Sequence, residues 1–387
     1  MPIFALIQVL ISRIVITVIA VLSVVGIGSF SEAPQHLVIE EKPVSIQEET
    51  TLPIDGVVDI RELSEESLPD PEESKPKEAV SVPIAEETVE VPVTIPIQEV
   101  TVPLSFSQIN TDTAKTLVNV LCTQNSAGAA HPITGSGVII DPRGVVITNA
   151  HVAQFFLLKD HPVENALQCT LRTGSPARNT YTAELLYISP EWVRLHASDI
   201  NNTAPKGTGE YDYALLRITG RTDPQAQLPA TFPFVSIGIH DESIQTGDQA
   251  LVAAYPAGFL GGVSIQRDLF SVSSVATIGE RFTFLENTID LISVGGTVVS
   301  QGGSSGGAVV SQENTLIGII VTSTQADTTA ERDLRAITTG YINRSLIENE
   351  NTTIEGLLFG DVLLKARLFN LGVAPALTAL FLPYLVQ

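Results

Sequence analysis

The sequence predicts an all-β fold of two small barrels, preceded by an N-terminal membrane helix and a disordered linker and followed by a C-terminal helical tail. Three observations predict it. Residues 1–30 are apolar, residues 31–104 are acidic and rich in proline, and residues 105–350 contain short β-branched runs between turn signals. Short strands with frequent turns are typical of barrels. The remaining residues, 351–387, are expected to form the tail.

The N-terminal segment is apolar enough to be a membrane anchor. Pro2–Phe30 contains one charged residue, Arg13, and Ile14–Phe30 contains none. A bilayer-spanning helix needs about 20 apolar residues, and those before Arg13 can extend this one. No clean Ala-x-Ala cleavage site occurs near Ser31–Ala33, so we expect an uncleaved anchor rather than a cleaved signal peptide. Either alternative places the rest of the chain outside the cytoplasm, tethered to the cell membrane or secreted.

The next segment is expected to be a disordered spacer. Ser31–Ser105 carries 18 acidic and 4 basic residues and contains a loose x-Pro-x repeat, with Val82–Ile84 and Val91–Val93 as examples. Such a segment cannot bury enough apolar surface to offset the entropy of ordering, and its prolines favour an extended chain. A partner-binding or autocleavage segment is the alternative.

Composition limits the classes of partner and cofactor. The chain carries 43 acidic and 21 basic residues, a net charge of −22, which argues against nucleic acid as a partner. Two cysteines exclude a disulfide-dense scaffold and a CxxC metal site, and we expect neither a metal nor an organic cofactor. Cys122 and Cys169 fall in two predicted strands. A disulfide in an oxidising envelope and two buried free thiols both remain open.

The strands of the two barrels follow in order. The folded domain is expected to begin near Ser105–Thr113, and the residues from Trp192 to Gly209 are expected to form an exposed loop. Leu228–Phe234 crosses to the second barrel. The predicted strands of the first barrel are Ala114–Cys122, Thr134–Asp141, a second hairpin strand from Val145, Ala166–Thr173, Tyr181–Ile188 and Asp212–Ile218. Those of the second are Ala250–Ala254, Val263–Ile265, Leu269–Ile278, Asp290–Ser293, Ala308–Val310, Leu316–Thr322 and Arg335–Ile337.

A glycine cluster, Gly302–Gly307, lies between the β-branched runs Thr297–Val299 and Ala308–Val310. A flexible linker would be polar on both sides, so the cluster predicts a tight loop that joins two buried strands and presents a serine. Ser305 is the candidate nucleophile, and the amides of Gly303 and Ser305 could form an oxyanion hole. A phosphate-binding loop is disfavoured because no Gly-Lys-Ser/Thr follows.

A nucleophilic serine needs a base, and the base needs an orienting carboxylate. His151 lies just past the second strand of the predicted hairpin. Asp212 stands at the mouth of a buried strand, with Asp199 as the competing acid. The candidate catalytic residues are therefore, in chain order, His151, Asp212 and Ser305.

These motifs resemble those of the trypsin/chymotrypsin-like serine proteases, most closely the bacterial HtrA-like branch. The matching stretches are Thr148–Val152, Asp212–Leu216 and Gly303–Ala308, with weaker matches at Gly247–Phe259 and Leu316–Ile320. The resemblance covers about residues 110–350 and implies the two-barrel chymotrypsin-like fold. It also implies an endopeptidase that cuts proteins or peptides with Ser305 as nucleophile, His151 as base and Asp212 as the orienting acid.

The resemblance carries further expectations. By the family's loop order, Val299 and Ser300 approach the base of the pocket that takes the residue before the cut. Neither carries a charge, so we expect cleavage after small or medium apolar residues. Only 36 residues follow Asn351, which is too few for the peptide-binding PDZ domain common in HtrA-like proteins.

The tail is expected to be helical. Ile342–Asn351 is typical of the start of a helix, and Leu368–Val386 is apolar but interrupted by two prolines. We expect a helix that packs on the barrel or touches the membrane surface. A second membrane span is disfavoured because Lys365 and Arg367 would then lie on the outer side.

The competing function is a latent or inactive protease-like module that binds a partner at the cell surface. A complete set of His151, Asp212 and Ser305 argues against an inactive module, because degenerate members of such families often lose one of the three. The sequence does not separate a latent protease from a constitutive one, and it leaves the oligomeric state open.

Overall fold

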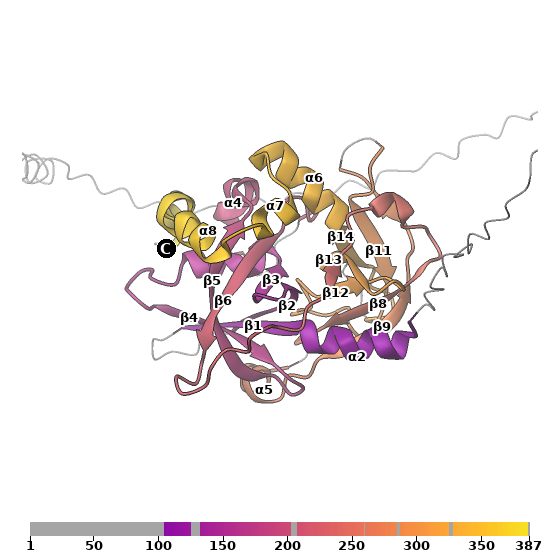
Figure 1. Ribbon diagram of the computed structural model, residues 1–387, viewed down its shortest axis with the longest axis horizontal. Helices are drawn as coiled ribbons and strands as arrows, with labels where there is room; N and C mark the ends of the chain where they lie inside the picture. The colour runs from indigo at the N-terminus through magenta and orange to yellow at the C-terminus, as the bar shows by residue number, and fades with distance from the viewer. Residues whose placement is uncertain are drawn as a thin grey trace, which may run out of the picture. The chain divides into compact units, whose positions relative to one another are not determined.

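The computed structural model describes residues 104–124, 132–202, 207–258, 260–284, 287–324 and 328–385 (Figure 1). All of them belong to one compact unit, Val93–Gln387, of the two into which the chain divides. The predicted membrane helix, and all but the last residue of the predicted linker, lie outside the described residues. The described part is predominantly β, with two antiparallel sheets and a helical C-terminal tail.

Six antiparallel strands close the first barrel in the order β1–β2–β3–β6–β5–β4. Aliphatic side chains such as Val118, Ile147 and Leu216 fill it and are fully buried. The strands are β1 (Leu117–Gln124), β2 (Ile133–Asp141), β3 (Val145–Thr148), β4 (Leu167–Thr173), β5 (Arg178–Ile188) and β6 (Ala214–Arg221). The predicted strands of this barrel therefore form, with shifted ends.

Eight strands form the second sheet, in the order β10–β11–β14–β13–β12–β8–β9, with β7 parallel to β13. A second apolar cluster, which includes Val252, Val309 and Ala336, forms its core. The strands are β7 (Ser236–Ile237), β8 (Gln249–Ala254), β9 (Val272–Thr277), β10 (Arg281–Phe282), β11 (Leu291–Gly295), β12 (Ala308–Val310), β13 (Thr315–Ser323) and β14 (Leu334–Thr338). The two sheets together confirm the two-barrel fold.

A helix that the sequence analysis missed precedes the first barrel. In α2 (Phe106–Thr116) a capping box begins the helix, because Ser105 Oγ accepts from the Gln108 amide and Gln108 Oε1 accepts from the Ser105 amide. The start of the predicted strand Ala114–Cys122 was wrong, since the first three of these residues complete the helix. The helix packs against β2 in the first barrel and against β8 and β12 in the second sheet, so it ties the two together.

Two other segments differ from their predictions. The stretch from Trp192 to Gly209 does not begin as an exposed loop, because Ser189 caps the helix α4 (Pro190–His196) and Trp192 is buried. Proline at the first helical position favours this start. Val263–Ile265 is not a strand but lies in the helix α5 (Gly262–Arg267). A run of three apolar residues is too short to distinguish a strand from a helix.

The chain ends in a run of helices, of which the first packs on the second sheet and the later ones pack on the first barrel and its helices (Figure 1). They are α6 (Thr339–Glu350), α7 (Ile354–Leu358), α8 (Val362–Leu368), the π-helical turn η3 (Phe369–Val373) and α9 (Ala374–Leu385). α8 packs on β5, and α9 packs on α4 and on α3 (Ala150–Leu157). Two 3₁₀ turns, η1 (Ala197–Asp199) and η2 (Asp241–Ser243), complete the secondary structure of the described residues.

Candidate active site

The start of α3 fixes His151. β3 ends at Thr148, and His151 occupies the first turn of the helix that follows. Asn149 takes the N-cap position, is fully buried, and donates from its side-chain amide to the main-chain oxygen of Asp212 at 2.9 Å. One turn along, Gln154 Nε2 donates to the His151 carbonyl at 2.8 Å. Asn149 therefore fixes the start of the helix that carries His151 to the Asp212 segment, independently of the contact between the His151 and Asp212 side chains.

Both carboxylate oxygens of Asp212 hold His151. Oδ2 lies 2.7 Å from His151 Nδ1, and Oδ1 accepts from the His151 backbone amide at 2.9 Å. Burial alone lowers the pKa of His151, but the charge and the hydrogen bond of Asp212 outweigh it and raise the pKa above its ordinary value of 6.5. The competing acid, Asp199, pairs with His196 at 3.1 Å. With Nδ1 engaged, Nε2 is the ring atom left to exchange a proton.

Contacts with α6 fix the residues on both sides of Asp212. Tyr211 has a left-handed backbone, with φ of 59°, and its amide donates to the Tyr341 hydroxyl at 3.0 Å. The Tyr213 hydroxyl is hydrogen-bonded to Ser345 Oγ at 2.9 Å. Asp212, which is buried, is thus held at the mouth of β6 by a helix from the far end of the domain.

The loop ahead of β12 presents Ser305. Gly303 and Gly306 have φ of +91° and +82°, where a side chain would strain the backbone. Ser304 is buried and turns inward, because its hydroxyl donates to the Val299 carbonyl at 2.6 Å. Ser305 is only half-buried. Of the two adjacent serines, Ser305 is therefore the accessible one.

The segment before this loop was predicted wrongly. Thr297–Val299 is not a buried strand, since Val298 is 55% exposed and the Thr297 amide donates to Ser300 Oγ at 2.9 Å within a turn. Gly295, with φ of +65°, ends β11 just before it. The β-branched composition favoured a strand, but the turn chemistry of the glycine prevailed.

Two backbone amides of the Ser305 loop are available as hydrogen-bond donors, and the nearby carbonyl groups are already paired. Gly302 O accepts from the Ala257 amide at 2.7 Å, and Gly303 O accepts from Ser136 Oγ at 2.8 Å. Within the described residues, the amides of Gly303 and Ser305 donate to no acceptor of the chain. Two preorganised amides beside a serine are what an oxyanion hole requires.

Ser136, in β2, is a site residue that the sequence analysis did not single out. Its side chain is fully buried, and its hydroxyl donates to Gly303 O while accepting from the Tyr255 amide at 2.9 Å. Its own amide donates to the Ser305 carbonyl at 2.7 Å. One residue of the first barrel thus holds three backbone groups around the nucleophile loop. The available signal was its position between two glycines, which in a strand mark a close approach of another backbone.

The same residue links the nucleophile loop to the histidine hairpin. Thr148 Oγ1 donates to the Ser136 carbonyl at 2.7 Å, three positions before His151. A Cβ on Gly306 would collide with both of these groups, so the loop and the hairpin are in close contact. In the part of the chain that the structure describes, no hydrogen bond joins Ser305 Oγ to the His151 ring. Such bonds are often long without substrate and tighten in the substrate complex.

The residues predicted at the pocket base, Val299 and Ser300, are both fully buried. Val299 packs in the apolar cluster of the second sheet, and the Ser300 carbonyl accepts from Arg332 Nη1 at 3.1 Å. The structure therefore places a guanidinium beside the Ser300 backbone. Arg332 follows 32 positions later, and no local pattern pointed to it.

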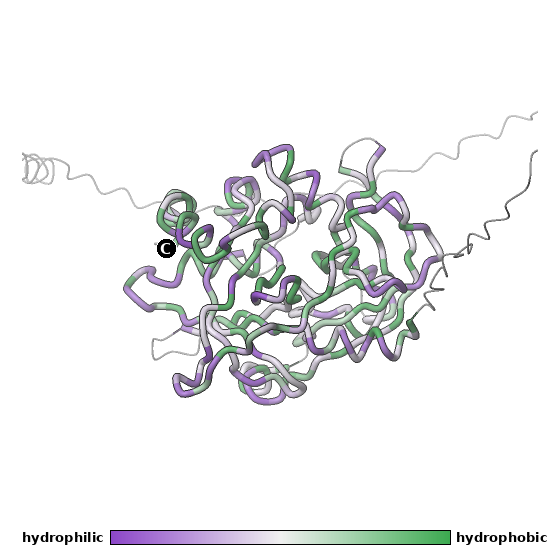
Figure 2. The backbone as a smooth tube through the Cα atoms, viewed as in Figure 1, coloured by the Kyte–Doolittle hydropathy of each residue, from purple (hydrophilic) through white to green (hydrophobic). Residues whose placement is uncertain are grey.

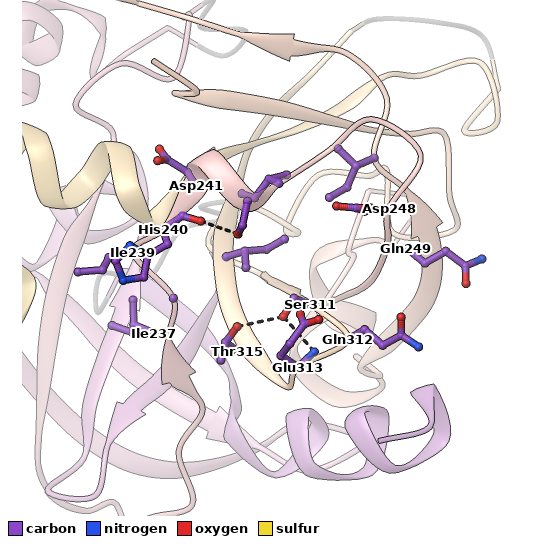
Figure 3. A pocket seen from close by; sticks show the side chains of 15 residues that line it. Ile237, Ile239, His240, Asp241, Asp248, Gln249, Ser311, Gln312, Glu313 and Thr315 are labelled. Atoms are coloured by element: carbon purple, nitrogen blue, oxygen red, sulfur yellow. Dashed lines mark hydrogen bonds between the residues drawn. The ribbon is translucent and has the colours of Figure 1, made fainter. Parts of the chain in front are cut away.

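A cavity of about 690 Å³ opens on the second sheet (Figure 3). Its lining comes mainly from residues 237–249 and 311–317, and none of the three candidate catalytic residues lines it. Its histidine, His240, is 79% exposed and pairs with Glu242 at 3.3 Å. Among the described residues, no three His, Cys, Asp or Glu side chains gather as metal ligands. The cavity is therefore separate from His151, Asp212 and Ser305.

Cys122 and Cys169 face each other across β1 and β4 and form a disulfide. The bridge joins positions 47 residues apart in the chain. The sequence left pairing open because only the register of these two strands decides it. The disulfide staples the first barrel and takes no part in the constellation of His151.

A family model described as "Trypsin-like peptidase domain" matches residues 135–319. No curated protein matches the chain. Among solved structures 713 chains match.

Two of these structures are HtrA-type or serine endoproteases. One is a variant of the HtrA-type protease AlgW with a tripeptide, 21% identical with a TM-score of 0.41, where 64% of each chain is covered. Another is a serine endoprotease from Yersinia pestis, 23% identical with a TM-score of 0.39, where 64% of this chain and 68% of that chain are covered. The chain spans less than two thirds of the length of the first of these proteins.

Proposed function

Because this chain carries a trypsin-like peptidase domain over residues 135–319, we propose that it is a membrane-tethered serine endopeptidase that works outside the cytoplasm. His151, Asp212 and Ser305 are its catalytic residues. The observation that carries the proposal is the double attachment of Asp212 to the amide and ring of His151, next to a serine loop with two available amides.

The chemistry follows from these positions. Ser305 Oγ attacks the carbonyl carbon of the scissile peptide bond while His151 Nε2 accepts its proton. Asp212 holds Nδ1–H and stabilises the imidazolium that forms. The amides of Gly303 and Ser305 donate to the oxyanion, and the loss of one such donor typically lowers kcat by about 10² to 10³.

The intermediate then resolves in two steps. His151 gives its proton to the leaving amine, which breaks the peptide bond and leaves an acyl ester on Ser305. A water molecule that loses a proton to the same ring nitrogen attacks the ester and releases the second product. The residues of the chain thus supply every proton transfer, and no metal or cofactor is invoked.

We propose that the substrates are proteins or peptides cut after small or medium apolar residues. The uncharged Val299 and Ser300 support this choice, and Arg332 beside the Ser300 carbonyl disfavours a basic residue by like-charge repulsion. Cleavage-site profiling across a peptide library tests it. Dominant cutting after Arg or Lys would contradict the assignment.

The tether and the location rest on the apolar Pro2–Phe30 segment, with support from the disulfide, because disulfides persist outside the reducing cytoplasm. Spheroplasts that express the full chain should lose the domain when an impermeant protease is added. Digestion only after lysis would contradict an extracytoplasmic domain. Release of the full chain by alkaline carbonate would contradict the anchor.

A latent protease is the second candidate, favoured by one observation. The structure has no Ser305–His151 hydrogen bond among its described residues, so a partner or a substrate could be required to close that contact. A serine-directed reagent separates the two states, because it labels only a serine whose base is in reach.

The decisive experiment is labelling with a fluorophosphonate probe. The full chain should be labelled, whereas Ser305→Ala and His151→Ala should not. Ser107→Ala on the exposed face of α2 and His240→Ala are the matched controls and should be labelled like the parent chain. No labelling of a folded parent would favour the latent module.

A further inference from the structure

The helix that ends the chain has an outward face built almost entirely from apolar side chains. From Leu368 to Leu385 the sequence contains no charged residue. Leu364, Leu368 and Leu371 are 53%, 62% and 81% exposed. Further exposed apolar side chains on the same helix are Val373, Leu380, Leu382 and Tyr384. In Figure 2 the last helical segment, next to the C-terminus, is accordingly coloured mostly as hydrophobic.

The inward face of the same helix is already occupied. Phe369, Leu377 and Phe381 are buried against the first barrel and its helices. The polar groups also point inward, because Asn370 Nδ2 donates to the Leu185 carbonyl at 2.6 Å and Thr378 Oγ1 donates to the Leu157 carbonyl at 3.2 Å. The outward face is therefore left with almost no polar group that needs a partner.

This helix is long enough to span a bilayer but is packed along the barrel. Within the described residues, Val362–Leu385 alone passes the length and composition test for a membrane span, with a mean hydropathy of 1.6. About a quarter of its apolar window, 28%, is buried in the fold. While Phe369 and Phe381 keep their contacts, the helix cannot leave the barrel to cross a membrane.

We propose that the outward face of Val362–Leu385 lies on the surface of a lipid bilayer and seats the peptidase domain on the membrane. An amphipathic helix binds in the plane of the interface when one face is apolar and its cations can reach the headgroups. Arg367 is the one charged group on the exposed face, and it is a cation. An interface with another protein would instead require a polar rim with hydrogen-bonding partners.

The length of chain outside the structure supports the same occupant. The described residues begin at 104, and the segment before them starts with Pro2–Phe30, which is long and apolar enough for a membrane anchor. The choice of a lipid bilayer as the partner of this face therefore rests on the membrane tether of the proposed function. A tethered domain meets a bilayer at high local concentration, so even a modest affinity of this face for lipid would keep it there.

The test uses the fragment Val93–Gln387, which lacks the N-terminal apolar segment and is one compact unit of the chain. It should sediment with phosphatidylcholine vesicles that contain phosphatidylglycerol. The variant Leu368→Glu/Leu371→Glu should lower the partition coefficient at least about tenfold, because two charges enter the apolar face. The matched control is Val263→Glu/Phe270→Glu, which changes exposed apolar residues elsewhere and should sediment like the parent fragment.

Three outcomes would overturn the proposal. If the folded parent fragment stays in the supernatant, this face does not bind a lipid bilayer. Self-association lost in Leu368→Glu/Leu371→Glu, without vesicle binding, makes the face a contact between copies of this chain. Resistance of the vesicle-bound fragment to alkaline carbonate makes the helix a span rather than a surface element.

Two further readouts keep the result interpretable. If Leu368→Glu/Leu371→Glu fails to fold, Leu371→Trp replaces it, and brominated lipid should quench the added tryptophan but not the buried Trp192. Unquenched fluorescence at position 371 would then overturn the proposal. Fluorophosphonate labelling of the same samples reports on Ser305 independently, so a failed membrane surface and a failed peptidase are distinguishable.

Discussion

His151 sets the pH at which the proposed site can work. Only the neutral ring can accept the Ser305 proton, so activity should rise with pH as His151 deprotonates. Because Asp212 raises the pKa of His151 above 6.5, half-maximal kcat/KM is expected above pH 6.5. Asp212→Asn should move this midpoint down and lower kcat by about 10⁴. Cleavage of a fluorogenic peptide from about pH 5 to 9 measures both effects.

The same pKa shift has a consequence for stability with a defined sign. The folded chain binds the His151 proton more tightly than the unfolded chain. The contribution to the free energy of unfolding is therefore complete below the unfolded value of 6.5 and is lost as pH rises through the higher folded value. If kcat/KM of the parent chain reached half its maximum at or below pH 6.5, the raised pKa of His151 would be contradicted. His240→Ala should leave the pH profile of kcat/KM unchanged, since that ring is exposed and lines a cavity that does not include His151.

Ser136 should behave as a positioning residue. Ser136→Ala removes the hydroxyl that holds the Gly303 carbonyl and the Tyr255 amide, so the oxyanion amides lose their fixed orientation. We expect kcat to fall about 10- to 100-fold with KM little changed. Steady-state kinetics on one peptide measure both constants. Thr116→Val, which deletes a buried hydroxyl in α2, is the control. Equal effects of the two substitutions would reduce Ser136 to a structural role.

The candidate catalytic residues could be predicted from the sequence because each stands in a short local motif. His151 follows a hairpin, Asp212 precedes an apolar strand, and Ser305 lies in a glycine loop. Ser136 and Arg332 were missed because their roles depend on partners 167 and 32 positions away in the chain. Contacts at such separations are set by strand register and loop path, which local patterns do not contain.

At the scale of elements, the disulfide between β1 and β4 carries the clearest energetic prediction. It closes a loop of 47 positions in the unfolded chain. Chain-entropy arguments assign such a cross-link about 4 kcal/mol of stability. Cys122→Ser/Cys169→Ser should lower the free energy of unfolding by roughly that amount, and chemical denaturation measures it. Reductant should destabilise the parent but not the variant, and a loss below about 1 kcal/mol would contradict the predicted contribution of the bridge.

The strands were predictable and several helices were not, for a physical reason. A strand of the barrel, such as β3 or β12, is a run of β-branched residues bounded by turns, and that pattern is local. α2 and α4 are instead set by caps, Ser105 with Gln108 and Ser189 with Pro190, in stretches whose composition suggested loop or strand. α5 and Thr297–Val299 show the same limit, since a run of three residues carries no period.

At the scale of the whole molecule, the C-terminal helices support the segments that carry His151 and Asp212. α6 holds the segment of Asp212 through Tyr341 and Ser345, and α9 packs on α3, the helix of His151. α9, in the predicted tail, and α6, which precedes the tail, are therefore part of the structure that positions the proposed catalytic residues. Sequence could indicate that the tail was helical and apolar, but not which of its faces would meet the barrel.

That integration can be tested with two neighbouring residues of α9. Phe381 is fully buried, whereas Leu380 is 39% exposed on the proposed membrane face. Phe381→Ala should lower the free energy of unfolding by about 3–5 kcal/mol, because it removes a buried ring and leaves a cavity. Leu380→Ala should change it by less than about 1 kcal/mol. Urea denaturation of Val93–Gln387 measures both. Equal, small losses would mean that the tail is detached in solution, and the support of α3 by α9 would fail with it. A large loss confined to Phe381→Ala would establish one inward and one outward face, as the membrane proposal also requires.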